Sequence, residues 1–132
     1  MPEAPITALI AHVPQVGRLD WIGRRPERAA PMERLEAAAL LTDRGLEGDR
    51  AAKRSGGKRQ VSLLQAEHLE VLARLLRKTS VDPALLRRNL IVSGVPLRAL
   101  ARARFRVGPC LLEGWMKPWV CCLAIRQHSI AA

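Results

Sequence analysis

Aromatic residues are scarce in this chain of 132 residues, which contains one Phe, three Trp and no Tyr. The core must therefore be built mainly from Leu, Val, Ile and Ala. Proteins that hold single-stranded nucleic acid stack the bases on aromatic side chains, so few groups are available for that task. Apolar residues still make up 48% of the sequence, which is typical of one folded globular domain.

Long apolar runs are also lacking, and cysteines are few. No uncharged stretch approaches the length of a bilayer span. The first residues do not show the basic and then apolar pattern of a secretory signal. The three cysteines, of which Cys121 and Cys122 are adjacent, do not form the disulfide framework of a secreted domain. These absences predict a cytoplasmic protein that does not associate with a membrane.

Negative charge is the third deficit, because 12 Asp and Glu stand against 22 Lys and Arg, for a net charge of +10. A field of this sign attracts phosphates, acidic small molecules or nucleic acid. Arg outnumbers Lys heavily, and its forked guanidinium suits phosphate or carboxylate oxygens. An anionic or phosphate-bearing small molecule is therefore the expected partner, whereas nucleic acid is not expected. A genome that favours Arg codons would give the same composition without any ligand.

The elements expected from hydrophobic periodicity are mostly short strands, at residues 6–13, 59–64, 90–92, 104–107 and 110–113. We expect an amphipathic helix over 65–77, with Ser62 and Gln65 at capping-box spacing, and a short second helix over 82–88. We expect an exposed connection at 23–31 and a flexible basic loop at 51–58. The sequence of residues 32–41 is compatible with either a helix or a strand. The predicted fold is α+β and β-rich: a barrel-like sheet of short strands with one amphipathic helix and a short second helix.

Four sequence segments occur in an order that resembles the MOSC family, the C-terminal domain of molybdenum-cofactor sulfurases. They are residues 45–50 (GLEGDR), 59–64 (RQVSLL), 86–94 (LRRNLIVSG) and 104–108 (RFRVG). The resemblance implies a β-barrel-like fold and a role in sulfur or molybdenum-cofactor chemistry. It stops at Gly114, so we predict a MOSC-like domain over residues 1–114 and a divergent C-terminal tail over 115–132 that is incomplete or frame-shifted.

The resemblance also implies a catalytic cysteine just beyond the last matching strand. Cys121 falls at the place of the family's second cysteine, while Pro118 occupies the place of the first. Cys121 would accept sulfur as a persulfide from a pyridoxal-phosphate-dependent cysteine desulfurase, and the attacking species would be its thiolate. The alternative is a cysteine pair in a loose tail with no role. Cys110, at a predicted strand start, reads as a small core residue.

The cofactor-binding residues are expected among the arginines of the matching segments. Arg87, Arg88 and Asn89 suit a phosphate-bearing cofactor, and Arg50 and Arg59 could form the opposite wall. These arginines could instead be solvated or paired with nearby acids. Within residues 45–50, Asp49 and Arg50 could lock the loop while the two glycines supply its turn geometry. The three histidines show no metal-ligand spacing, so no metal site is predicted.

Three functions therefore remain open at this point. The first is a sulfur carrier that handles the molybdenum cofactor. The second is a molybdenum-cofactor-binding oxidoreductase that reduces N-hydroxylated compounds. The third is a degenerate scaffold or a basic module that binds nucleic acid, for which steep salt dependence would be diagnostic.

Overall fold

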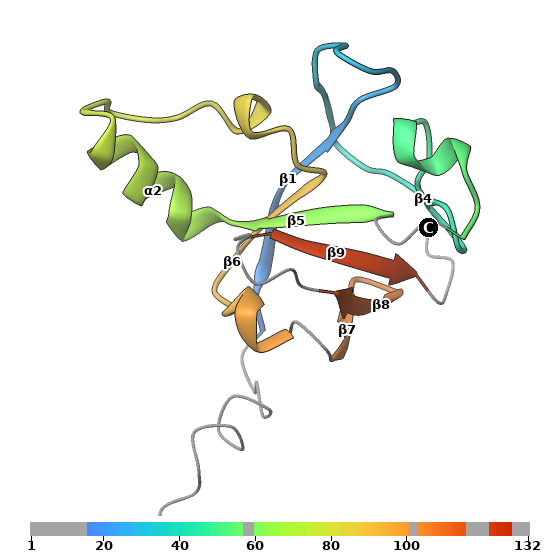
Figure 1. Ribbon diagram of the computed structural model, residues 1–132. Coiled ribbons are helices and arrows are strands. Elements are labelled where there is room, and N and C mark those ends of the chain that lie inside the picture. Colours follow the sequence, from blue (N-terminus) through green and yellow to red (C-terminus); the bar gives the residue numbers. More distant parts are fainter. Residues whose placement is uncertain (1–15, 57–59, 101–102, 116–121, 128–132) are drawn as a thin grey trace, which may run out of the picture.

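The computed structural model describes residues 16–56, 60–100, 103–115 and 122–127 (Figure 1). The strand predicted at residues 6–13, the predicted site residue Arg59 and the predicted catalytic Cys121 lie outside these ranges.

A seven-stranded sheet forms the body of the domain. Its strands lie in the order β2 (Glu33–Leu35), β1 (Arg18–Arg24), β6 (Leu90–Ser93), β5 (Val61–Gln65), β9 (Cys122–Gln127), β8 (Cys110–Trp115) and β7 (Arg104–Val107). Strands β5 and β6 are parallel, and the other neighbours are antiparallel. A second, two-stranded sheet pairs β3 (Leu40–Leu41) with β4 (Gly45–Leu46). The α+β, strand-rich class is confirmed, although within the described residues β2 and β7 do not pair to close a barrel.

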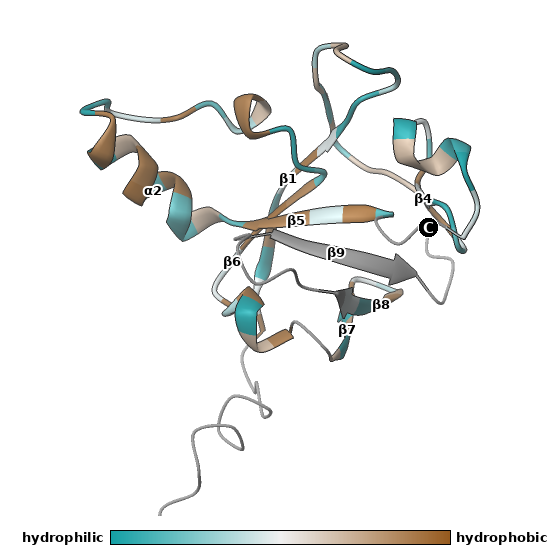
Figure 2. Ribbon diagram, viewed as in Figure 1, coloured by the Kyte–Doolittle hydropathy of each residue, from teal (hydrophilic) through white to brown (hydrophobic). Residues whose placement is uncertain are grey.

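Helix α2 (Ala66–Leu75) makes the crossover between the parallel strands β5 and β6. Parallel neighbours need such a connection because the end of the first strand and the start of the second lie at opposite edges of the sheet. The helix extends away from the end of β5, and apolar residues run along it (Figure 2). Ala73 is buried, but Val71, Leu75 and Leu76 are 53%, 75% and 57% exposed. The predicted apolar face is thus only partly covered.

The core is aliphatic, as the shortage of aromatic residues predicts. Leu63 of β5 and Leu112 of β8 are fully buried, and Cys110 is 7% exposed, which confirms it as a core residue. The other members of the buried cluster come from both sheets and from the segment 97–100: Leu40, Leu46, Val61, Leu90, Val92 and Leu97.

Several expectations need correction. Residues 23 and 24 belong to β1, and Gly23 is buried, so the exposed connection begins only after them. Part of the supposed loop at 51–58 is the 3-10 helix η1 (Arg50–Lys53). The capping box is wrong because Gln65 caps α2 without a side-chain hydrogen bond, while Ser62 bonds to Asn89.

Two remaining short segments are 3-10 helices. The predicted second helix is η2 (Pro83–Leu86), where Asp82 Oδ1 accepts a hydrogen bond from Ala84 N at 3.0 Å. The other, η3 (Leu97–Leu100), lies between β6 and β7.

Candidate anion-binding site

The loop over residues 45–50 is fixed from inside by its acidic residue. Asp49 is 7% exposed. Its Oδ1 accepts from Arg25 N at 2.8 Å, and its Oδ2 accepts from Ala51 N at 3.3 Å, at the start of η1. Gly45 and Gly48 have φ angles of 118° and 80°, which L side chains rarely adopt. The interpretation of this motif as a locked loop with glycine turns is confirmed for these three residues.

Arg50 follows directly and is exposed. Its backbone N donates to Arg25 O at 2.7 Å. Arg25 begins the connection between β1 and β2, residues 25–32. The 45–50 loop is therefore held against one end of this connection. The bond fixes the position of the Arg50 backbone, from which its side chain extends.

Asn89 lies at the start of β6 and joins three strands. Its Oδ1 accepts from Ser62 N at 3.0 Å and from Ser62 Oγ at 3.1 Å, and its Nδ2 donates to Gly23 O at 3.1 Å. The backbone adds a bond from Gly23 N to Asn89 O at 2.7 Å. Sequence reasoning did not foresee this structural role. The contact of Asn89 with a cofactor stays a prediction.

Arg87 contacts the same connection through its side chain. It ends η2 in the left-handed region, with φ 53°. Its Nη2 donates to Ala30 O at 2.7 Å, across 57 residues of sequence. Arg88 follows and is half-buried. Arg50 and Arg87, which are 37 positions apart in the sequence (87 − 50), are thus both tied to the connection at 25–32.

Arg50 and Arg87 are bonded to the 25–32 connection, which contains Arg25 and Arg28, and Arg88 follows Arg87 in the chain. These five residues are here called the basic rim: Arg25, Arg28, Arg50, Arg87 and Arg88. The ion pairs found among the described residues are Arg18–Asp20 and Arg24–Glu33, both at 2.8 Å. None of the basic-rim arginines is therefore ion-paired with a carboxylate of the described part of the chain. The alternative in which they pair with neighbouring acids does not apply there.

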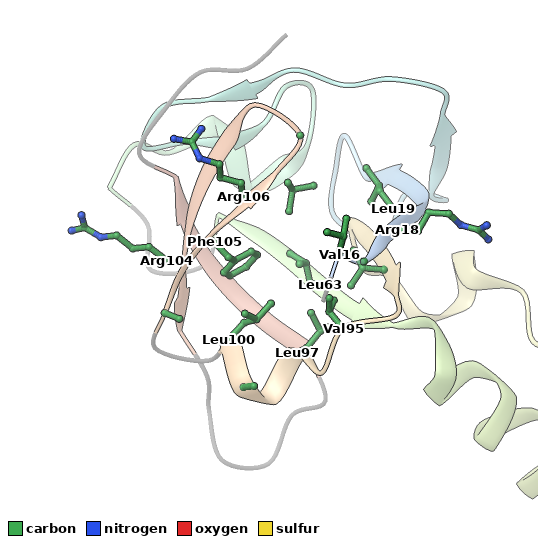
Figure 3. A pocket seen from close by; sticks show the side chains of 16 residues that line it. Val16, Arg18, Leu19, Leu63, Val95, Leu97, Leu100, Arg104, Phe105 and Arg106 are labelled. Atoms are coloured by element: carbon green, nitrogen blue, oxygen red, sulfur yellow. The ribbon is translucent and has the colours of Figure 1, made fainter. Parts of the chain in front are cut away.

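Two hollows among the described residues lie elsewhere. One, of about 520 Å³, is enclosed by β7, η3 and the start of β1 (Figure 3). The other, of about 570 Å³, lies between α2, η2 and Trp21 of β1. No predicted site residue that the structure describes lines either hollow.

Among the described residues, no three His, Cys, Asp or Glu side chains lie together as candidate metal ligands. In the same ranges, no helix has the length and apolarity needed to cross a membrane.

Comparison with known sequences identifies the family. The family model described as "MOSC domain" matches residues 48–128, which is more than half of the chain. The chain therefore belongs to the MOSC family, as its four motifs predict. The match extends past Gly114 into the segment set apart as a divergent tail. The domain boundary at that residue stays a prediction.

Solved structures share the fold. YiiM from Escherichia coli has a TM-score of 0.52 at 24% identity, with 74% of this chain and 44% of that chain covered. A protein described as hypothetical has a TM-score of 0.56 at 24% identity, with 71% and 43% covered. The chain thus spans less than half the length of either structure. A search of curated proteins finds no match.

Proposed function

We propose that this MOSC domain handles the molybdenum cofactor and carries its sulfur as a persulfide on Cys121. One observation supports the cofactor part: Arg50 and Arg87 come from distant segments and are both bonded to residues 25–32, and no basic-rim arginine forms an ion pair with a described carboxylate. Family membership supports the cofactor class.

The donor set fits the phosphate of such a cofactor. A guanidinium presents paired N–H groups that match two phosphate oxygens. The backbone of Arg50 is held by the bond from its N to Arg25 O, and the guanidinium of Arg87 is held by its bond to Ala30 O, both at 2.7 Å. Less conformational freedom is therefore lost when an anion binds. When bound, the cofactor supplies molybdenum chemistry, while the arginines bind and orient its phosphate.

The sulfur step assigned to Cys121 is a thiol exchange. Its thiolate attacks the outer sulfur of a persulfide on a pyridoxal-phosphate-dependent cysteine desulfurase. A new S–S bond forms at Cys121 while the S–S bond of the desulfurase breaks, and the desulfurase cysteine leaves as a thiolate. No outside oxidant is needed. Residue 122, which follows Cys121, is the first of β9 and is in register with Leu64 of β5, while Cys121 itself lies outside the described residues.

Anion binding is tested by the melting temperature in rising inorganic pyrophosphate, since a ligand that binds only the folded state raises it. We expect Arg50→Ala and Arg88→Ala to reduce the rise. Arg74→Ala, an exposed arginine of α2 outside the basic rim, removes the same charge and should keep it. Equal loss in all three variants would mean that only net charge matters.

Sulfur transfer is tested by mass spectrometry after incubation with a cysteine desulfurase, pyridoxal phosphate and cysteine. We expect one added sulfur atom on the peptide that contains Cys121. Cys121→Ser should abolish it and Cys122→Ser should keep it. Absence of the added sulfur, together with bound molybdenum and reduction of an N-hydroxylated base, would favour the oxidoreductase instead.

A further inference from the structure

Strand β7 ends the seven-stranded sheet. It pairs with β8 through a two-residue turn, with Val107 opposite Cys110 and Gly108 at φ 56°. In the described part of the chain no strand lies on its other side. In a hairpin of this length the pair that closes the turn exchanges its hydrogen bonds, and the pattern alternates along the strand. Arg104 and Arg106 therefore direct their backbone N–H and C=O groups away from β8.

The two faces of β7 differ in character. Phe105 and Val107 are half-buried and line the hollow of about 520 Å³. Arg104 and Arg106 are exposed and also belong to the lining of the hollow, but their guanidinium groups point away from it while Phe105 points into it (Figure 3). The hollow continues inward over aliphatic side chains, which are Leu63, Val92, Leu97 and Leu100. A strand added beside β7 would therefore meet apolar space on one face and positive charge on the other.

The charges restrict what such a strand can carry. On the side that is occupied, Glu113 of β8 lies opposite Arg104. The same cross-strand pairing on the open side requires Asp or Glu beside Arg104 and Arg106, because opposite charges in register stabilise a sheet and like charges destabilise it. Pairing of β7 with β7 of a second copy would bring these arginines together. The edge thus favours a different, acidic strand over a copy of itself.

We propose that the open edge of β7 binds an extended segment of a partner protein in which apolar residues alternate with Asp or Glu. The segment adds a strand to the sheet, so its main chain bonds to Arg104 and Arg106 while its apolar side chains enter the hollow. Its acidic side chains face the two guanidinium groups. This surface is separate from the basic rim and does not depend on the proposed function.

The proposal is tested with two short, capped, fluorescent peptides, one alternating Val with Glu and one alternating Val with Lys. Fluorescence anisotropy with the full chain should show about tenfold tighter binding of the Val/Glu peptide. Hydrogen exchange should slow at the amides of Arg104 and Arg106. Methylation of the peptide nitrogens that face β7 should abolish binding, which a purely ionic attraction would survive.

A charge reversal on β7 checks the orientation. Arg106 lies opposite Leu111 of β8. The new carboxylate of Arg106→Glu is therefore not placed directly opposite another carboxylate in the β7–β8 pair. The variant should prefer the Val/Lys peptide. Arg98→Glu on η3 is the matched control: it changes the net charge equally, does not line the hollow, and should keep the original preference.

Several results would overturn the proposal. One is equal binding of both peptides, or loss of the preference in both variants, since nonspecific charge would then explain the binding. Another is a concentration-dependent dimer whose contact protects the amides of β7, which would assign the edge to a second copy. A third is binding that appears only after deletion of residues 2–13, which would assign it to the chain itself.

Discussion

At the scale of single residues, the side chain of Asn89 connects strands in a way that its sequence motif does not predict. Its side chain takes part in hydrogen bonds with Ser62 and Gly23, which belong to two other strands. Asn89→Ala removes the acceptor of Ser62 N and the donor to Gly23 O, while Ser62 Oγ still accepts from the backbone N of residue 89. We expect the free energy of unfolding to fall by about 3 kcal/mol, measured by urea denaturation.

Arg88→Ala provides the control for this substitution. Arg88 adjoins Asn89 but is only half-buried, so its truncation should change the unfolding free energy by less than about 0.5 kcal/mol. If the two variants unfold at the same urea concentration, the hydrogen bonds of Asn89 do not hold the three strands together.

The two glycines of the 45–50 loop should respond differently to alanine. A Cβ on Gly45 would lie 2.3 Å from the backbone O of Gln60, whereas one on Gly48 would lie 2.6 Å from Arg24 Nη1, the end of a flexible side chain. Both positions carry the cost of a positive φ, but only Gly45→Ala forces the backbone to move. We expect losses in unfolding free energy of about 3 kcal/mol at Gly45 and about 1 kcal/mol at Gly48. Thermal unfolding of the two variants side by side measures the difference, and a larger loss at Gly48 would contradict it.

At the scale of elements, a hydrogen bond to a glutamate side chain connects helix α2 to the segment that follows β6. Glu67, in the first turn of α2, accepts a hydrogen bond from Gly94 N at 2.8 Å, just after β6. This bond lowers the pKa of the Glu67 carboxyl, while partial burial opposes the shift. A lowered native pKa means that the stabilisation is present above the unfolded pKa and is lost as the pH falls through the native pKa.

We therefore expect Glu67→Gln to flatten the acid side of the stability curve. The unfolding free energy of the unchanged protein should fall as the pH drops below the ordinary range of a glutamate, and that of Glu67→Gln should fall less. Denaturant titrations at a series of pH values measure both. Glu70→Gln removes a carboxylate from the same helix without touching Gly94, and its curve should follow that of the unchanged protein.

The sequence predicts those elements whose stabilising contacts are local. Residues 104–107 alternate charged and apolar side chains before a Gly-Pro turn, and β7 has those bounds. Strand β1 was missed because a bulge between Leu19 and Trp21 breaks its alternation. The role of Asn89 was missed because its partners lie 27 and 66 residues away. Arg50 and Arg87 could be selected from their motifs, but their common attachment to residues 25–32 is visible only in the fold.

At the scale of the whole molecule, the sheet is one continuous series of strands that passes through β9. This strand pairs with β5 on one side and with β8 on the other. Among the described strands, the hairpin of β8 and β7 is hydrogen-bonded to the rest of the sheet through β9. Leu112 of β8 is nevertheless fully buried in the common core. The segment that sequence reasoning set apart after Gly114 therefore contains a strand on which the hairpin depends.

A chain that ends at Gly114 should consequently fail to fold as one unit. Without β9, the inner edges of β5 and β8 lose their hydrogen-bonding partners, and an isolated hairpin is at best marginally stable in water. We expect no cooperative urea transition and strong binding of a dye that reports exposed apolar surface. A chain that ends at Gln127 retains β9 and should unfold cooperatively. If the shorter chain instead shows the same transition as the longer one, residues 115–132 are a separable tail and β9 contributes little to the stability of the sheet.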